Sequence, residues 1–372
     1  MYIWEQENWP LLTYDKGRLA ALLGQVSREQ GRLLGRMHDL AFELRREAQL
    51  STLTEDVVRS SEIEGEKLDS AQVRSSIARR LGMDVGGLVP ADRGVEGVVE
   101  MMLDATTNYA QPLTADRLFD WHAALFPTGR SGLQKITVGH WRDDSGGPMQ
   151  VVSGPIGRRK VHFEAPPAVR LPEEMDRFLR WFDATGNIEP GLAHLWFVTI
   201  HPFDDGNGRI ARAIADMALA RSERNAQRFY SMSAQIRRER SDYYTMLERA
   251  QKGALDVTPW QEWFLACLNR AIESSQGTLA AVLDKARFWQ RFAQQSLNAR
   301  QVKVLNRLFD GFEGKLTTSK YAKLTKSSQD TAYRDILELV ERGALRRDPG
   351  GGRSTRYSLI RVATAADLEK ER

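Results

Sequence analysis

The sequence predicts a mainly α-helical protein of two or three domains. Apolar residues recur at spacings of three and four through most of its 372 residues, which is the pattern of helices that bury one face. Strand-like segments beside turn residues are confined to one hairpin near the middle of the chain and to a short pair near its end. The length exceeds that of one typical domain of about 100–200 residues.

The first two predicted helices cover residues 16–50 and 53–66. Leu19, Val26 and Leu33 mark the packed face of the first helix, and Gly65 is a suitable stop for the second. The same periodicity predicts further helices over residues 70–81, 94–109, 114–126, 172–184, 190–200, 233–250 and 259–289.

Turn residues mark the two places where strands are expected. Residues 149–153 and 159–163 flank the turn sequence Gly154-Pro155-Ile156-Gly157, which predicts a small β-hairpin. Toward the end of the chain the pattern predicts three short helices and then two strands, over residues 299–309, 317–324, 328–342, 344–347 and 356–359.

Composition excludes several classes of protein. A hydrophobic fraction of 42% and a charged fraction of 27% are those of an ordinary globular chain, not of a disordered or fibrous one. Cys267 is the single cysteine, so neither an intramolecular disulfide nor a cysteine-rich metal site is expected. The first residues lack the order of a secretion signal, and no uncharged apolar run reaches about 18 residues. We therefore expect a cytoplasmic protein with no membrane partner.

The stretch from His201 to Arg212 gathers the groups that phosphate chemistry needs. It lies between two apolar segments predicted as helices, so its turn leads into a helix N-terminus, where free N–H groups favour an anion. The imidazole of His201 has an unperturbed pKa of about 6.5 and can take a proton from a hydroxyl near neutral pH. Asp205 offers a hard oxygen ligand that suits Mg²⁺.

The remaining residues of this stretch suit a phosphate-binding turn. Gly206 and Gly208 leave room for an approaching phosphate, and Asn207 can donate from its amide. Arg209 and Arg212 are three residues apart and can fork onto phosphate oxygens. Each residue alone has a common structural explanation, such as a helix cap, a tight turn or a solvated helix face. The evidence for a phosphate-binding turn is therefore their combination.

Residues 201–212 resemble the Fic-domain motif, His-x-Phe-x-(Asp/Glu)-Gly-Asn-Gly-Arg-x-x-Arg, at every specified position. The resemblance implies a helical Fic fold that transfers AMP from ATP, with Mg²⁺, to a Ser, Thr or Tyr hydroxyl of an unidentified target protein, or of the chain itself. It implies that the predicted hairpin is the flap that holds the target segment by β-strand addition. By position, it implies a general base at His201, a core anchor at Phe203, a Mg²⁺ ligand at Asp205, a phosphate cradle at Gly206, Asn207 and Gly208, and outer-phosphate ligands at Arg209 and Arg212.

A second short pattern stands upstream of the motif. Ser60 and Glu64 are four residues apart, hence on one helical face, and Gly65 follows. The structural interpretation is a surface helix end, where a glutamate near the C-terminus is mildly unfavourable and favours a cationic partner. The segment resembles the Fic inhibitory pattern, (Ser/Thr)-x-x-x-Glu-(Gly/Asn), which implies that Glu64 pairs with Arg212 and obstructs productive ATP binding.

The end of the chain carries a basic surplus. Residues 297–372 hold 16 Lys and Arg against 10 Asp and Glu, a net charge of +6, whereas the whole chain has a net charge of +4. The order of predicted elements resembles a winged helix-turn-helix, with 328–342 as the recognition helix and 348–353 as the wing. Such units also serve in dimerisation or protein docking, so a homodimer or a protein partner stays open. The resemblance implies double-stranded DNA as a partner, with phosphate contacts from Arg334, Arg347, Arg353 and Arg356.

These patterns divide the chain into four parts. We expect an N-terminal helical region with the inhibitory helix over 1–113, a Fic catalytic core over 114–267, a linker helix over 268–296, and a winged helix-turn-helix over 297–372. The favoured function is a protein adenylyltransferase, because a mere scaffold needs neither a base nor a metal ligand nor both arginines. The alternatives are a DNA-binding transcriptional regulator that uses the Fic core as a nucleotide sensor, and an enzyme that removes AMP from modified proteins.

Overall fold

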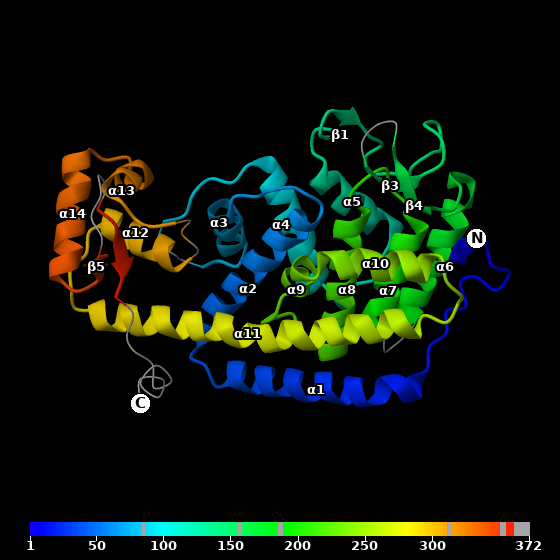
Figure 1. Ribbon diagram of the computed structural model, residues 1–372, viewed down its shortest axis with the longest axis horizontal. Helices are drawn as coiled ribbons and strands as arrows, with labels where there is room; N and C mark the ends of the chain where they lie inside the picture. The colour runs from blue at the N-terminus through cyan, green and yellow to red at the C-terminus, as the bar shows by residue number, and fades with distance from the viewer. Residues whose placement is uncertain are drawn as a thin grey trace.

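The computed structural model describes residues 1–83, 87–154, 158–184, 189–310, 312, 314–349 and 355–360. The predicted mainly α-helical fold is confirmed, since the strands of the described chain form only small two-stranded sheets. The molecule is elongated, with α11 (Thr258–Phe292) running along most of its length and α1 (Lys16–His38) lying alongside it (Figure 1). In the described ranges, no helix combines the length and apolar character that crossing a membrane requires.

The predicted helix over 16–50 is wrong, because a turn at residues 39–41 divides it. α1 ends at His38, and α2 (Phe42–Ile63) starts after the turn and absorbs the separately predicted second helix. Both helices present apolar faces to the same core, so the hydrophobic pattern continues across the turn and conceals it. The predicted glycine stop is confirmed, since Gly65 takes a φ of +88° directly after α2.

A further predicted helix, over 233–250, is also divided. α9 (Met232–Arg238) and α10 (Arg240–Gln251) meet at Glu239, whose φ of −104° and ψ of 28° depart from helical values. No glycine or proline marks this break in the sequence. Five other helices follow their predicted ranges closely: α3 (Ser70–Arg80), α4 (Arg93–Thr107), α5 (Ala115–Leu125), α6 (Leu171–Ala184) and α7 (Pro190–Ile200). The helix expected after the motif loop is α8 (Asn207–Glu223), and the 3₁₀ turns η1 (Ile3–Glu5) and η2 (Ala168–Arg170) were not predicted.

α7 and α8 form the centre of the main core. Every residue of α7 from Gly191 to Ile200 is buried, as its apolar sequence predicts, and α8 is buried from Arg209 to Ala220. One hydrophobic cluster joins these helices to α1, α2, α4 and α11, so the N-terminal helices share a core with the motif helices. The loop between α7 and α8 is therefore held between two buried helices.

Two hairpins lie near this loop. The predicted hairpin is confirmed as β3 (Gln150–Ser153) paired antiparallel with β4 (Lys160–Glu164), with a register shift between Val151 and Val152; residues 155–157 of its turn lie outside the described residues. A second hairpin, β1 (Arg130–Ser131) with β2 (Gln134–Lys135), was not predicted. Its strands are two residues long, too short to give an alternating pattern.

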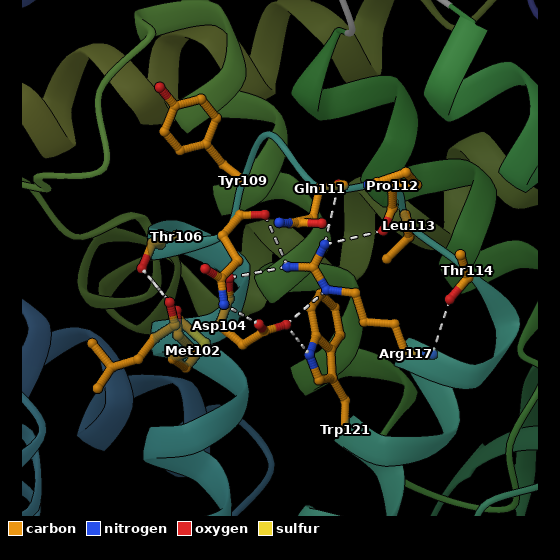
Figure 2. A network of polar contacts seen from close by, with 12 residues as sticks. Met102, Asp104, Thr106, Tyr109, Gln111, Pro112, Leu113, Thr114, Arg117 and Trp121 are labelled. Carbon is orange, nitrogen blue, oxygen red and sulfur yellow. Dashed lines mark hydrogen bonds and ion pairs between the residues drawn. The ribbon is translucent and has the colours of Figure 1, made fainter.

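A partly buried network of polar contacts fixes α5 against the end of α4. Arg117 donates from Nε to Asp104 Oδ2 at 2.7 Å and from its Nη atoms to the carbonyl oxygens of Asp104 and Pro112 at 3.0 and 3.1 Å. Trp121 Nε1 donates to the same carboxylate oxygen at 2.8 Å. Figure 2 shows Arg117 at the centre of these contacts. They tie α5 to the last turn of α4 and orient α5, which contributes to the wall of the motif loop.

The last part of the chain has its own hydrophobic core at one end of the molecule (Figure 1). An isolated bridge joins Leu316 to Tyr357 beside the final hairpin. A charge network fastens this part to the N-terminal helices: Lys285 lies 2.9 Å from Glu47 and 2.8 Å from Asp310, and Arg74 binds the same two carboxylates. The elements follow the predicted order: α12 (Ala299–Phe309), α13 (Thr318–Thr325), α14 (Gln329–Glu341), β5 (Leu345–Arg347) and β6 (Tyr357–Leu359).

Candidate active site

His201 ends α7 in an uncommon backbone conformation. Its φ of 52° and ψ of 58° are left-handed, a state that a non-glycine residue adopts at an energetic cost and that recurs at functional sites. Its Nδ1 lies 3.2 Å from the carbonyl oxygen of Val198, which can only accept a hydrogen bond, so Nδ1 carries the proton. Burial lowers the pKa of His201 to about 4. The imidazole is therefore neutral at pH 7, with Nε2 free to accept a proton.

Arg142 holds the backbone of this turn from the side. Its Nε donates to the carbonyl oxygen of His201 at 2.8 Å, and its backbone N donates to that of Pro202 at 2.9 Å. The guanidinium has no exposed surface and pairs with Asp144 at 2.7 Å. Sequence reasoning missed Arg142, because a lone arginine in a loop some sixty residues before the motif gives no signal of this contact.

Phe203 and Asn207 close the loop on itself. The Asn207 side chain accepts from the Phe203 backbone N at 3.0 Å and donates to the Phe203 carbonyl oxygen at 2.7 Å. Asn207 thus shapes the loop, and its expected donation to a phosphate stays a prediction. Phe203 is fully buried, as a core anchor must be, and stacks on His122 with ring centroids 4.2 Å apart.

His122 supports the loop from α5. Burial lowers its pKa to about 4, so the ring is neutral, and Nδ1 accepts from the backbone N of Gly139 at 3.3 Å. Nε2 therefore carries the proton and donates to the carbonyl oxygen of Asp205 at 3.2 Å. Sequence reasoning missed His122, because no pattern connects it with the motif, which lies about eighty residues later.

The Asp205 carboxylate is held by two hydrogen bonds. Its Oδ1 accepts from the backbone N of Gly206 at 2.6 Å, and its Oδ2 accepts from the hydroxyl of Ser131 on β1. Among the residues with described positions, no three of His, Cys, Asp or Glu gather to hold a metal. A single partly exposed carboxylate suits Mg²⁺ bound mainly by water and phosphate oxygens, and does not suit a metal caged by protein ligands.

The two glycines of the motif meet different needs. Gly206 takes a φ of +82°, and a Cβ there would lie 2.9 Å from the ring of Phe126, so a side chain is excluded by conformation and by space. At Gly208 a Cβ would lie 2.2 Å from Oε1 of Glu64. The Glu64 carboxylate thus occupies the space above the first turn of α8 that the missing side chain leaves open.

Arg212 contacts Ser60 and Glu64 of the upstream pattern, as the resemblance implied. Its Nη2 lies 2.8 Å from Glu64 Oε1, its Nε donates to Ser60 Oγ at 2.9 Å, and Nη2 also donates to the Ser60 carbonyl oxygen at 2.9 Å. The Arg212 side chain is 2% exposed. Burial lowers the pKa of Arg212, but the Glu64 carboxylate together with Tyr243 and Tyr244 raises that pKa overall. Nη1 of Arg212 is buried and has no hydrogen-bond partner.

Arg209 also has a carboxylate partner, which sequence reasoning missed. Its Nη1 lies 2.6 Å from Oε2 of Glu66, and its guanidinium lies 5.0 Å from the ring centroid of Phe126. Nε of Arg209 is buried and unpartnered. The structure therefore brings together His201, Asp205, both glycines and both arginines around the N-terminus of α8, with Ser60, Glu64 and Gly65 beside them.

The predicted DNA-contacting residues lie elsewhere. Arg334 is exposed on α14, while Arg347 and Arg356 are exposed on the final hairpin, where Arg347 pairs with Tyr357. Arg353 lies outside the described residues. α14 and the final hairpin lie at the far end of the molecule from α7 and α8 (Figure 1).

The loop at the N-terminus of α8 lies within a stretch that matches a known protein family. Residues 112–219 match the model of the Fic/DOC family, and residues 2–83 match a domain of unknown function (DUF4172). The chain is thus similar to Fic/DOC proteins over one stretch and to DUF4172 proteins over another. It shares its fold with a Fic family protein from Desulfovibrio desulfuricans, at a TM-score of 0.53 and 24% identity over 94% of this chain and 98% of that one. A Fic domain containing signaling protein from Bacteroides thetaiotaomicron gives a TM-score of 0.51 at 19% identity, over 69% of this chain and 97% of that one.

Curated relatives are distant. A protein adenylyltransferase Fic from Drosophila grimshawi is 26% identical over 270 residues, which are 70% of this chain and 49% of the relative. The chain thus spans about half the length of the curated adenylyltransferases that it matches. A uridine 5'-monophosphate transferase from Xanthomonas campestris is 33% identical over 123 residues, 30% of this chain and 21% of that protein.

Proposed function

We propose that the protein is a nucleotidyltransferase that moves AMP from ATP to a Ser, Thr or Tyr hydroxyl of a target protein and is held inactive by Glu64. The observation that carries this proposal is the position of the Glu64 carboxylate, which fills the space beside Gly208 and binds Arg212. An anion held there by the protein itself marks the place that a nucleotide phosphate needs. The Fic/DOC match over 112–219 supports the same class of reaction.

In the proposed reaction, His201 acts as the general base. Its Nε2 takes the proton of the target hydroxyl while the hydroxyl oxygen attacks the α-phosphorus of ATP. The new bond joins that oxygen to AMP, the bond from the α-phosphorus to the bridging oxygen breaks, and pyrophosphate leaves. The neutral ring, with Nδ1–H directed at the Val198 carbonyl, is already in the form that this step requires.

The remaining motif residues would bind the nucleotide. Arg209 and Arg212 each keep one buried N–H without a partner, and these donors would bind the outer phosphates. Asp205 would hold Mg²⁺ together with phosphate oxygens and water, and the ion would neutralise phosphate charge. The backbone from Gly206 to Gly208 would line the phosphates at the N-terminus of α8.

The β3–β4 hairpin suits the capture of a target segment. Val152 and Val161 are 40% and 37% exposed, and each strand has one edge that pairs with no other described strand. An extended segment that adds to this edge would gain backbone hydrogen bonds, and the exposed valines would contact its side chains. Such binding would hold a target hydroxyl in place for His201.

Labelled nucleotides test the proposal. The Glu64→Gly variant, with Mg²⁺ and a lysate as the source of targets, should form protein-bound label from α-labelled ATP and none from γ-labelled ATP. His201→Ala in the same background should remove the label. Protein labelling from γ-labelled ATP would overturn AMP transfer in favour of phosphoryl transfer, and stronger labelling from α-labelled UTP would make the protein a UMP transferase.

We also propose that residues 297–372 form a winged helix-turn-helix that binds duplex DNA. The supporting observation is a basic surface at the predicted places, with exposed Arg334 on α14 and exposed Arg347 and Arg356 on the adjoining hairpin. Phosphate contacts release counterions, so the affinity should fall steeply with rising salt.

The full-length protein and a pool of random duplexes test this second proposal. Replacing Arg334, Arg347 and Arg356 together by alanine should weaken the binding measured by fluorescence anisotropy. Arg36→Ala, an exposed arginine on α1, is the matched control and should bind as the wild type does. A wild type that shows no binding at low salt would favour the docking-module alternative.

A further inference from the structure

The chain just after α2 returns toward the motif helix. Gly65 takes a φ of +88°, and the backbone N of Glu66 donates to the carbonyl oxygen of Ser61 at 3.0 Å, which closes the helix end. Residues two apart in a helix point about 200° away from each other. The left-handed glycine removes this restriction, so Glu64 and Glu66 both direct their carboxylates at α8.

The two carboxylates bind different arginines of the motif. Glu64 Oε1 lies 2.8 Å from Arg212 Nη2, and Glu66 Oε2 lies 2.6 Å from Arg209 Nη1. Both guanidinium groups are almost fully buried, with 2% and 3% of the side chain exposed. Each also keeps one buried N–H without a partner. Two buried cations that still have free donors form a site for two anionic groups, and one short segment fills both places.

Resting on the proposed function, we infer that Glu66 is a second inhibitory carboxylate, which holds Arg209 while Glu64 holds Arg212. A nucleotide must then displace two tethered anions to bind both arginines. Because one short turn carries both carboxylates, the release of one lowers the effective concentration of the other at its arginine. Removal of Glu64 alone leaves Arg209 paired, so it relieves only part of the inhibition.

The exposure of the two glutamates predicts different salt dependence. Glu66 keeps 47% of its side chain exposed and Glu64 keeps 30%. The more exposed pair is the more strongly screened by ions. The contribution of Glu66 should therefore decrease at high ionic strength, while the contribution of Glu64 should persist.

A matched control lies on the same helix end. Glu62 pairs with Arg59 at 2.7 Å and with Arg237 at 3.6 Å, and makes no contact with Arg209 or Arg212 among the described ion pairs. Glu62→Gln therefore removes a carboxylate of the same segment without touching the motif arginines. It should leave both nucleotide affinity and transfer at the wild-type level.

The experiment compares wild type, Glu62→Gln, Glu64→Gln, Glu66→Gln and the Glu64→Gln/Glu66→Gln double variant. The apparent affinity for Mg·ATP is measured by calorimetry, and transfer is measured with α-labelled ATP, each at low and high salt. Glu66→Gln should raise the affinity roughly two- to fivefold at low salt, and less at high salt. The double variant should exceed Glu64→Gln in both affinity and transfer.

The outcomes separate this inference from the proposed function. If Glu64→Gln gains transfer while Glu66→Gln equals the wild type and the double variant equals Glu64→Gln, Glu66 has no inhibitory role and the proposed function stands. A weaker affinity in Glu66→Gln would overturn the inference as well, because Glu66 would then orient Arg209 for the nucleotide. If Glu66→Gln raises the affinity for Mg·ATP but no variant transfers label, the two-carboxylate site is supported and the proposed transfer reaction is not.

Discussion

The replacement of Glu64 by glycine should release Arg212 without disturbing its position. After the change, Arg212 keeps the hydrogen bonds to Ser60 Oγ and to the Ser60 carbonyl oxygen, both 2.9 Å long. The guanidinium therefore stays beside the first turn of α8 and gains free donors. The space above Gly208, which the Glu64 carboxylate fills, becomes open to a phosphate.

The size of the effect follows from the contact that is lost. A hydrogen bond to a charged group contributes about 1.5–3 kcal/mol, and a tenfold change corresponds to about 1.4 kcal/mol. Because Glu64 is 30% exposed, solvent screening favours the lower end of this range. We expect AMP transfer to rise at least about tenfold, as measured by the label that the target retains from α-labelled ATP.

Two controls define the result that would refute this reasoning. Glu64→Gly combined with Arg212→Ala should lose the gain, because the released guanidinium is then absent. Equal labelling by wild type and Glu64→Gly, with both proteins folded and a competent target present, contradicts an inhibitory role for Glu64. Loss of an existing AMP-removing activity in Glu64→Gly would show that this carboxylate acts in the reverse reaction.

Further predictions concern the base, the metal ligand, the loop support and acid stability. His201→Ala should lower transfer by about 10²–10⁴-fold and leave calorimetric nucleotide affinity nearly intact; retained transfer would remove His201 from the mechanism. Asp205→Ala should weaken Mg·ATP binding in the same titration, because the ligand that holds the ion is gone; an unchanged affinity would make it structural. Arg142→Ala should lower kcat more than nucleotide affinity, since Arg142 fixes the His201 backbone and contacts no motif arginine among the described hydrogen bonds and ion pairs; equal losses would contradict this. Burial lowers the pKa of His122 to about 4 and that of His194 to about 3, below an unfolded value of about 6.5. The unfolded state then binds more protons below pH 6.5, so the free energy of unfolding should fall by about a few kcal/mol as the pH is lowered from about 6.5 to 4. A urea midpoint that stays constant over this pH range would refute the prediction.

The sequence predicted those parts of the site that are contiguous along the chain. His201 to Arg212 is one loop and one helix start, so residue type and spacing were enough to place the proposed base, the proposed metal ligand and the two arginines together. Arg142, His122 and Ser131 reach the same loop from other elements. Their contacts depend on how helices and hairpins pack, and a single sequence contains no pattern that reveals such packing.

Some helix boundaries also could not be predicted from the sequence. Apolar spacing predicted most helices, because each buries a stripe in one common core. It missed the breaks at residues 39–41 and at Glu239, where the apolar stripe continues across a turn without glycine or proline. Glu66 was missed for a related reason, since its direction depends on the left-handed Gly65 and not on helical spacing.

The unbroken course of α11 limits how the protein can be divided into fragments. Its 35 residues span about 52 Å, with Ile272 and Leu279 packed in the main core and Phe288 and Phe292 in the final one. A truncation that removes residues 297–372 would leave both phenylalanines uncovered at a helix end. Such a fragment is expected to self-associate and to express poorly. A soluble fragment with the motif loop therefore requires polar replacements at Phe288 and Phe292, and no cut between 258 and 292 avoids exposing one of the two cores.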